Sequence, residues 1–345
     1  MKTSTLVVAL GAAAAFSPLD GSGVPRWQPQ TSGVTSRLRG VSAASERVVW
    51  ASGANGTILR TVDGGGTWQR LAVPDTDKLD FRDIDAVDER TAYALSIGAG
   101  RASRIFKTTD AGAHWALQFT NDDPKAFYDA MAFWDANRGL AVSDSVEGTF
   151  VILATQDGGA HWARVASDAL PPALPNEGAF AGSGTNIAVY GRDLAWIGTG
   201  ASTKSRVLRT TDGGRTWAIA DTPIVTSASA GIFSIAFRDP GHGLVVGGDY
   251  RKEKFSMDVA AATSDGGSTW TLIKGLGGFR SVVAHLPGSQ ASWVAVGPSG
   301  ADISSDDGRT WLPVEGDGYH AFSFAPRGSV GWAVGESGRI AKLVW

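Results

Sequence analysis

The stretch Thr210-Thr-Asp212-Gly-Gly214-Arg-Thr-Trp217 is one of six copies of a single phrase in this chain of 345 residues. Each copy has Thr or Ser, then Asp two residues later, Gly two residues after that, and Thr or His followed by Trp. The aspartates are 41 to 55 residues apart, at Asp63, Asp110, Asp157, Asp212, Asp265 and Asp306. A period of this length is typical of propellers and other repeat arrays.

Apolar segments around each phrase predict four β-strands per repeat. The first strand reads, for example, Ile232-Phe-Ser-Ile-Ala, the third runs into the phrase, and the phrase Trp opens the fourth. The second strand carries an aromatic residue or Leu and occurs seven times, at Trp50, Tyr93, Leu140, Trp196, Leu244, Trp293 and Trp332. We therefore expect an all-β fold, a seven-bladed β-propeller with a phrase in six of its blades.

The seventh blade is predicted to close the ring. Residues 319–345 supply three strands and end where a seventh phrase would lie, whereas Trp27 begins a fourth-strand segment with no phrase before it. Pairing of residues 27–34 with residues 319–345 would leave only short, protected strand edges. The expected organisation is one propeller domain over residues 27–345.

The beginning of the chain has the pattern of an export signal. Lys2 precedes an apolar run over residues 6–15, and Ala13-Ala14-Ala15 resembles a cleavage site, so residues 1–15 are predicted to be a signal peptide and 16–26 a linker. The run is too short to span a bilayer. We expect a periplasmic or secreted bacterial protein, most simply a monomer.

The composition of the chain excludes some classes of partner and of covalent cross-link. The net charge is −3, and no run of lysine or arginine is present, which argues against a nucleic-acid partner. The chain contains 45 glycines and no cysteine, so disulfides are excluded and tight turns are favoured.

The repeated phrase is predicted to be turn chemistry. Its Asp can accept hydrogen bonds from nearby backbone N–H groups, its Gly can take a positive φ, and its Trp can pack on the sheet. Calcium binding is the alternative, but the phrase lacks the alternating oxygen ligands of a calcium loop. His114 and His161 occupy the position of Thr in other copies, so we interpret them as turn variants and expect neither a metal nor a cofactor.

The phrase resembles the Asp-box, or bacterial neuraminidase repeat, which is shared by sialidases, sortilin-like receptors, xyloglucanases and the photosystem II assembly factors. Together with Gly331-Trp-Ala-Val-Gly-Glu-Ser-Gly-Arg-Ile, it is most similar to the assembly-factor propellers. The resemblance implies a propeller over nearly the whole mature chain. It implies no single activity, because one fold hosts many functions.

Polar residues recur at the start of the first strands, on the propeller face opposite the Asp-boxes. We expect them to converge on the mouth of the central channel and to bind a ligand, together with the enlarged loop of blade five: Arg39, Arg82, Arg280, His320, Tyr128, Asp249 and Tyr250. Arginines suit a carboxylate or phosphate. A solvated rim without a ligand is the alternative. The long proline-rich lead-in to blade four, residues 171–180, is a second candidate for function.

Three functions remain open. The favoured hypothesis is a non-catalytic propeller that binds a protein, peptide or glycan. The alternative is a sialidase-type glycoside hydrolase or lyase; that resemblance would make Tyr128 the nucleophile, Glu177 its activator, Asp144 the acid/base, and Arg39, Arg82 and Arg280 the carboxylate-binding triad. A Phe-Arg-Ile-Pro motif expected of sialidases is absent. A redox enzyme has the least support, since no dinucleotide fingerprint stands between a strand and a helix.

Overall fold

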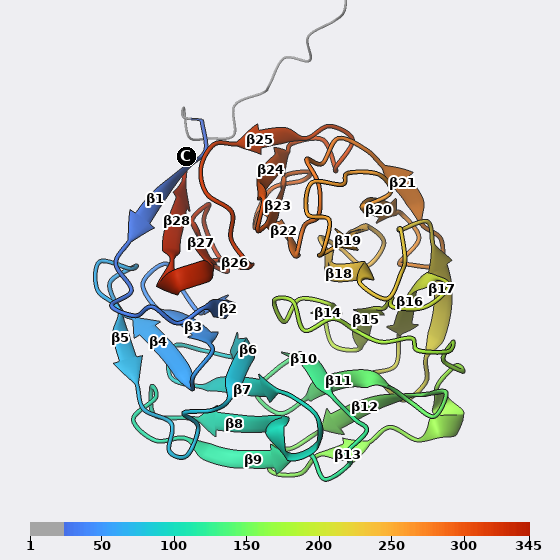
Figure 1. Ribbon diagram of the computed structural model, residues 1–345, viewed down its shortest axis with the longest axis horizontal. Helices are drawn as coiled ribbons and strands as arrows, with labels where there is room; N and C mark the ends of the chain where they lie inside the picture. Colours follow the sequence, from blue (N-terminus) through green and yellow to red (C-terminus); the bar gives the residue numbers. More distant parts are fainter. Residues whose placement is uncertain (1–23) are drawn as a thin grey trace, which may run out of the picture.

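Seven four-stranded sheets stand around a central axis in the computed structural model, which describes residues 24–345 (Figure 1). Neighbouring strands within every sheet are antiparallel, and six sheets follow the chain order from the axis outward, while the seventh carries β1 outside β28. The predicted all-β seven-bladed propeller is therefore confirmed. The predicted signal peptide lies outside the described residues, as does most of the predicted linker.

The first four blades follow one another along the chain. Their strands are β2 (Leu38–Ala43), β3 (Val49–Gly53), β4 (Thr57–Thr61) and β5 (Gln69–Leu71); β6 (Asp80–Ala86), β7 (Ala92–Ile97), β8 (Arg104–Thr108) and β9 (Ala116–Thr120); β10 (Tyr128–Phe133), β11 (Gly139–Val146), β12 (Thr149–Thr155) and β13 (Ala163–Arg164); and β14 (Ile187–Tyr190), β15 (Leu194–Gly198), β16 (Ser205–Thr210) and β17 (Ala218–Thr222).

Blades five to seven complete the ring. Their strands are β18 (Ala230–Phe237), β19 (Gly243–Asp249), β20 (Ala260–Thr263) and β21 (Thr271–Ile273); β22 (Val282–His285), β23 (Trp293–Gly297), β24 (Gly300–Ser304) and β25 (Leu312–Val314); and β26 (Ala321–Phe324), β27 (Gly331–Val334) and β28 (Ile340–Val344) with β1 (Arg26–Gln30).

The two ends of the described chain share blade seven. Strand β1 pairs with β28 in antiparallel register, with Trp27 opposite Leu343 and Gln30 opposite Ile340. The ring is therefore closed by hydrogen bonds between the first and last strands, as the sequence predicted. Closure supplies the fourth strand of blade seven and leaves only short, protected strand edges.

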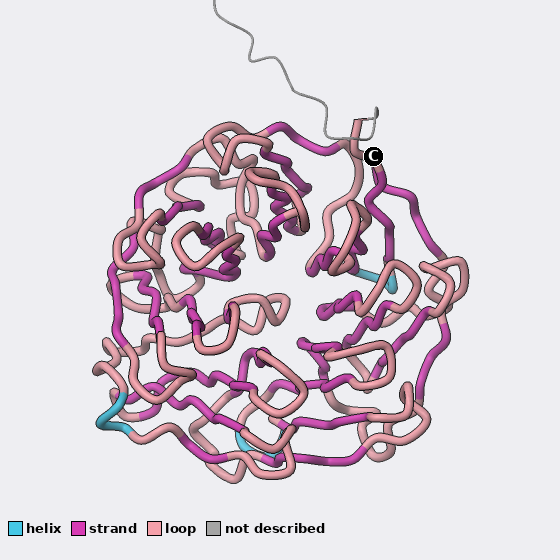
Figure 2. Tube along the Cα trace, turned by 180° about the vertical axis from the view of Figure 1, so that it is seen from behind, coloured by secondary structure: helices cyan, strands magenta, loops and turns pink. Residues whose placement is uncertain are grey.

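Within residues 24–345, helical structure is confined to three short 3₁₀ turns, η1 (Gly100–Ala102), η2 (Ser167–Ala169) and η3 (Glu336–Gly338). Seen from the opposite face, the ring consists of strands and loops with these turns in cyan (Figure 2). Between residues 24 and 345, no helix has the length and apolar character needed to cross a membrane.

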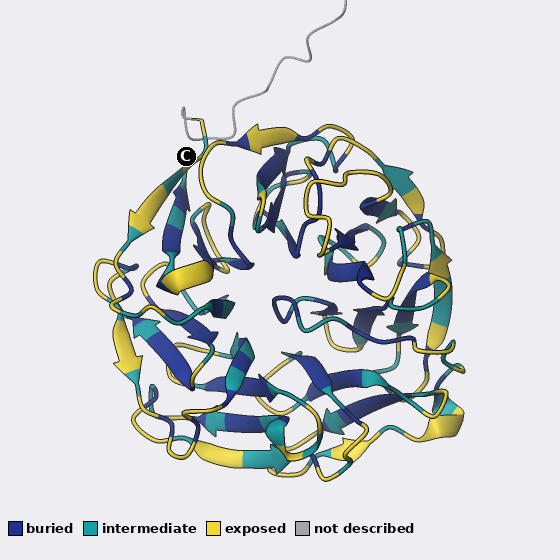
Figure 3. Cartoon of the chain, viewed as in Figure 1, coloured by how far each residue is buried: buried dark blue, intermediate teal, exposed yellow. Residues whose placement is uncertain are grey.

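The hydrophobic core lies between neighbouring blades rather than at one centre. Second and third strands are almost entirely buried, whereas outer strands such as β5 face solvent along most of their length (Figure 3). The largest fully buried side chains come from the predicted second-strand series and include Trp50, Trp196, Trp293 and Trp332. Each flat sheet buries both faces against its neighbours, which explains why these strands are continuously apolar.

The six Asp-boxes make the same hydrogen bonds. In blade four, Asp212 Oδ1 accepts the N–H of Thr216 at 3.0 Å and the hydroxyl of Thr210 at 2.8 Å, while Oδ2 accepts the Thr216 hydroxyl at 2.6 Å. Gly214 donates its N–H to Thr210 Oγ1 at 3.0 Å and has φ +88°, a conformation that glycine adopts without strain. These bonds close each turn internally.

The boxes also join neighbouring blades. The box of one blade lies on the second-strand aromatic residue of the blade before it: Tyr93 donates its hydroxyl to Gly158 O at 2.7 Å, and Trp196 donates its indole N–H to Gly266 O at 2.8 Å. Trp332 of blade seven reaches Gly64 O of blade one at 3.3 Å. The repeated phrase therefore holds the ring together at its periphery, away from the channel.

Candidate site at the channel mouth

A β-bulge brings one side chain from the first strand of six blades to the mouth of the central channel. In four blades the pairing of first and second strands skips one residue, so that two residues oppose one. The skipped residues are Arg39, Arg82, Asp129 and Phe233.

Hydrogen bonds place the same irregularity in blades six and seven. Ser281 donates its N–H at 2.8 Å to the carbonyl of Val296, the residue that also pairs with Val282. His320 donates its N–H at 2.7 Å to Val334, which pairs with the following residue. The side chains at all six of these positions line one cavity.

Two predicted ligand residues lie one position before the bulge residue of their blade. Tyr128 precedes the bulge residue Asp129, and Arg280 precedes Ser281; neither lines the cavity. A shift of one residue turns a strand side chain to the opposite side, so both point into the protein. Tyr128 is fully buried, with its ring edge-on to Phe119, and burial raises its pKa to about 12.

Arg280 is instead half of a buried ion pair. Its Nη2 lies 2.6 Å from Asp302 Oδ2, and both side chains are 4% exposed. A second Arg280 donor bonds the carbonyl of Phe279 at 2.9 Å. The expectation that Arg280 faces the channel is therefore wrong, because its charge is already neutralised inside blade six.

The lead-in to blade four crosses the channel. Figure 1 shows the segment before β14 (light green) reaching toward the middle of the ring. Along residues 178–185 it contacts three other blades: Arg82 donates to Ala181 O at 3.1 Å, Ser183 donates to Ser281 O at 2.8 Å, and Thr185 donates to Ser234 Oγ at 2.8 Å. This segment, which we call the plug (residues 178–185), forms the floor of the mouth.

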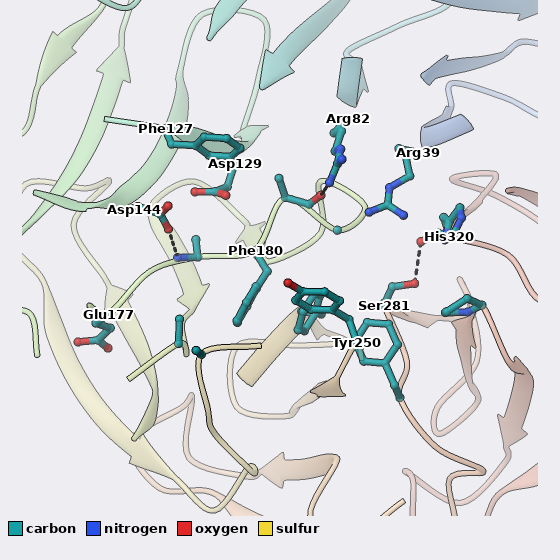
Figure 4. A pocket seen from close by; sticks show the side chains of 18 of the residues that line it. Arg39, Arg82, Phe127, Asp129, Asp144, Glu177, Phe180, Tyr250, Ser281 and His320 are labelled. Atoms are coloured by element: carbon teal, nitrogen blue, oxygen red, sulfur yellow. Dashed lines mark hydrogen bonds between the residues drawn. The ribbon is translucent and has the colours of Figure 1, made fainter. Parts of the chain in front are cut away.

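The plug and the bulge residues enclose a cavity of about 830 Å³ (Figure 4). Side chains from all seven blades contribute to its lining, including Arg39, Arg82, Asp129, Asp144, Glu177, Phe180, Phe233, Tyr250, Ser281 and His320. These residues come from segments that are far apart in the sequence, so closure of the ring assembles the site. A concave site with a few convergent polar groups is the usual form of a binding pocket.

One wall of the cavity is basic. Arg37 and Arg82 share one carboxylate, that of Asp80, at 3.6 and 3.0 Å, whereas Arg39 makes no ion pair with any residue of the range 24–345. The Nε of Arg39 is buried without a hydrogen-bond partner. Burial, together with the neighbouring charges of Arg82 and Arg37, lowers the pKa of Arg39 to about 9. An anion in the cavity would relieve this repulsion.

His320 stands next to the basic wall as a neutral side chain. Its Nε2 lies 2.7 Å from Glu336 Oε1, but burial and the charge of Arg39 lower the pKa of His320 to about 4. At neutral pH the imidazole is therefore uncharged and can contribute a hydrogen bond to a ligand without adding to the positive charge.

The facing wall is acidic and belongs to blade three. Asp129 is 2% exposed, and its Oδ2 has no hydrogen-bond partner; Asp144 accepts the N–H of Ala179 in the plug at 3.1 Å. Burial and then the charge of Asp144 raise the pKa of Asp129 well above its usual range, and burial raises that of Asp144 to about 6. Across the cavity lie Arg39 and His320 (Figure 4).

Aromatic rings make up the third side. Phe180 of the plug stacks on Phe233 with ring centroids 4.1 Å apart, and Phe279 meets Phe233 edge-on at 4.7 Å. Gly200 and Gly231 lie beneath Phe180: a Cβ on either would be 2.6 Å from the Cα of the other. The glycines allow blades four and five to approach closely, and the ring covers their backbones.

Of the remaining predicted site residues, some line the cavity and others are buried inside the protein. Tyr250 lines the cavity and is 43% exposed. Asp249 does not line it; its carboxylate accepts the Ser229 hydroxyl at 2.8 Å. Glu177 borders the cavity but is 1% exposed, and its carboxylate accepts Arg206 Nε at 2.9 Å and the Thr199 hydroxyl at 2.6 Å. The charge of Glu177 is therefore compensated within blade four.

Sequence reasoning did not select Asp129 or Phe233 as site residues, and it included Phe180 only as the last residue of the blade-four lead-in, residues 171–180; these three shape the acidic and aromatic sides. The apolar pattern alone does not separate a bulge residue from its neighbour, since Asp129 and Tyr128 each stand two positions before a buried apolar residue, Met131 and Ala130 respectively. The plug has no repeat counterpart, so no internal alignment could have placed Phe180. Between residues 24 and 345, no group of three or more His, Asp or Glu side chains is arranged to hold a metal ion.

Comparison with known proteins agrees with this geometry. The family model described as photosynthesis system II assembly factor YCF48 matches residues 19–189, about half of the chain. The resemblance to the assembly-factor propellers is confirmed. No curated protein sequence matches the chain.

Solved structures similar to this Asp-box propeller show the same fold. YCF48 bound to a D1 peptide has a TM-score of 0.65 at 16% identity, with 92% of this chain and 97% of that chain covered. YCF48 from Cyanidioschyzon merolae has a TM-score of 0.61 at 18% identity, over 92% and 98% of the two chains. The GH74 xyloglucanase from Xanthomonas campestris has a TM-score of 0.65 at 15% identity, but this chain spans 53% of it.

Proposed function

We propose that this assembly-factor-like propeller binds a peptide segment of a protein partner in the channel-mouth cavity. One observation carries the proposal: the bulge residues of six blades converge on a cavity of about 830 Å³ that combines a basic wall, an acidic wall and an aromatic side. A peptide offers charged groups and apolar side chains at short intervals, which suits this combination.

The rim beside the cavity supports a macromolecular partner. The loop between β19 and β20 exposes three apolar side chains, Tyr250 at 43%, Phe255 at 41% and Met257 at 64%. Tyr250 also lines the cavity, so the exposed surface continues from the cavity outward. Neighbouring apolar side chains exposed beside a pocket are typical of protein-binding surfaces.

A similar propeller supports the same mode of action, since YCF48 has been solved with a D1 peptide bound. For this chain, the peptide and the partner remain part of the proposal. We further propose that the protein acts outside the cytoplasm, because residues 1–15 have the pattern of a signal peptide. Cell fractionation with determination of the mature N-terminus tests that part, and an intact N-terminus in the cytoplasm would refute it.

The binding proposal is tested with a library of randomised synthetic hexapeptides passed over the purified, immobilised protein, with bound peptides identified by mass spectrometry. We expect enrichment of peptides that combine an acidic group with an aromatic or large apolar residue. Removal of charge from the basic wall in an Arg39→Ala/Arg82→Ala double variant should reduce acidic enrichment about tenfold or more, because both guanidiniums face the cavity.

The matched control is Arg90→Ala. Arg90 is exposed in the turn between β6 and β7, at the other end of blade two, and does not line the cavity. An unselective library with wild-type protein would refute peptide binding. If the wild-type protein hydrolysed a fluorogenic glycoside and the double variant did not, the cavity would be a glycosidase active site and not a peptide-binding site.

A further inference from the structure

We infer that Asp129 and Asp144 form a subsite for an organic cation, so that the cavity selects a peptide carrying a positive group as well as an acidic one. The inference rests on the proposed function, since it names the class of peptide that the same cavity takes. Its decisive observation is the environment of Asp129: this residue is 2% exposed and lines the cavity, and its Oδ2 has no hydrogen-bond partner among residues 24–345.

A buried carboxylate oxygen without a donor is costly to the folded protein. The cations around Asp129 do not satisfy it. Arg82 attracts its charge, but the donors of Arg82 bond Asp80 Oδ2 at 3.0 Å and Ala181 O at 3.1 Å. Lys125, which also lines the cavity, pairs with the exposed Glu147 at 2.6 Å.

Asp144 completes the subsite from the second strand of the same blade. One of its oxygens accepts the N–H of Ala179 at 3.1 Å, which orients the carboxylate at the edge of the plug. After burial, the charge of Asp144 raises the pKa of Asp129, as expected for two like charges that share a site. A bound cation would take the place of a proton and satisfy both carboxylates at once.

The chemistry of the pair favours an ammonium or guanidinium group over a metal ion. Divalent cations in proteins require more oxygen or nitrogen ligands than these two side chains provide. A nitrogen cation carries several N–H donors and needs only two or three acceptors. Across the cavity, Arg39 lacks an ion pair within residues 24–345, so the two walls together suit a ligand with both charges.

The aromatic side lies between the two charged walls. Phe180 and Tyr250 stand below the gap that separates Asp129 from Arg39 (Figure 4). A peptide bound there would place an apolar side chain on these rings while its cationic and anionic groups reach opposite walls. The propeller then fixes the order of charges along the peptide, because the basic wall and the acidic wall belong to different blades.

The hexapeptide library tests this inference in two forms, one with acetylated and one with free N-termini. With wild-type protein we expect selected peptides to contain Lys or Arg in the acetylated form, or to depend on a free α-amino group in the other. In Asp129→Asn and Asp144→Asn, enrichment of the cation should fall about tenfold or more, while acidic and aromatic enrichment persists. Two separate variants are used in case one of them folds poorly.

Asp168→Asn is the matched control, since Asp168 is an exposed acid in η2, just after the last strand of blade three, and does not line the cavity. It should leave cation enrichment unchanged. Wild-type selection of acidic and aromatic peptides without any positive group would overturn the cation subsite but leave peptide binding intact. The absence of any selection would refute peptide binding itself, so the two failures are distinguishable.

Discussion

The same residue type serves two purposes in two regions of this propeller. At the periphery, the box aspartates are open to solvent and fully hydrogen-bonded, and the pKa of Asp212 falls to about 2: its burial acts against this shift, but hydrogen bonds from Thr216 and Thr210 outweigh it. At the channel mouth, Asp129 is buried and incompletely bonded, and its pKa is raised. An aspartate that recurs in six blades with its hydrogen bonds made has a structural role. A single buried aspartate with an unpaired carboxylate oxygen is instead a candidate for ligand binding.

Glu177 is the intermediate case and provides the largest expected effect. It is as buried as Asp129 but is paired with Arg206, so Glu177→Ala leaves a buried guanidinium without its partner. We expect the free energy of unfolding to fall by about 3–5 kcal/mol, measured by urea denaturation. Glu336→Ala, at a carboxylate 55% exposed, is the control and should change stability far less. If both variants lowered the free energy of unfolding equally, burial would not explain the contribution of Glu177 to stability.

Loss of a box aspartate should have a smaller effect. Asp212→Ala removes an acceptor for Thr216 N–H and for two hydroxyls, and should lower stability by on the order of 1–2 kcal/mol, mostly through unmade hydrogen bonds. Peptide selection should be unchanged. Because the pKa of Asp212 is lowered, this contribution is complete above about pH 4 and disappears as pH falls toward 2. A selective loss of binding would show that the box is more than a structural turn.

The reverse sign is expected for Asp129→Asn. Since burial and the charge of Asp144 raise the pKa of Asp129, its ionised form destabilises the fold, and this cost grows as pH rises above about 4. The Asn variant should therefore be more stable than wild type by about 1 kcal/mol near pH 8 and indistinguishable from it near pH 4. Chemical denaturation at the two pH values measures this. A destabilised variant at both would mean that the carboxylate is structural.

The smallest effect is expected at the box histidines. His114 occupies the position of Thr in other boxes, and its ring is 89% exposed while it contacts Asp110 at 2.7 Å. His114→Thr restores the commoner residue and keeps a hydroxyl donor for Asp110, so no measurable change in melting temperature or peptide selection is expected. A clear loss of binding would give this box a function that the other five lack.

The fold could be predicted because each blade repeats the same local chemistry. Asp212 and its five counterparts form hydrogen bonds only with residues a few positions away, so the sequence motif alone predicts the turn. The second-strand aromatic residues recur at the same spacing and pack against the next box. The missing seventh phrase and the early Trp27 together indicated how the ring closes.

The site could be predicted only in part. The structure places Arg39, Arg82 and His320 at the cavity, whereas their role in ligand binding stays a prediction. In blades three and six the same reasoning chose Tyr128 and Arg280, one residue early. A bulge adds a residue without changing composition, and one position decides which side of a strand a side chain faces.

By itself, the sequence determined the number of blades, the four strands of each, the closure of the ring and the chemistry of the box turns, since all of these depend on contacts that are local or repeated. Only the tertiary structure decided which charges meet. The pairing of Arg280 with Asp302 joins two segments of one blade, whereas the path of the plug across the channel and the separation of a basic wall from an acidic one join residues from distant parts of the chain. Such contacts depend on the register of individual strands and on burial, which no single segment encodes.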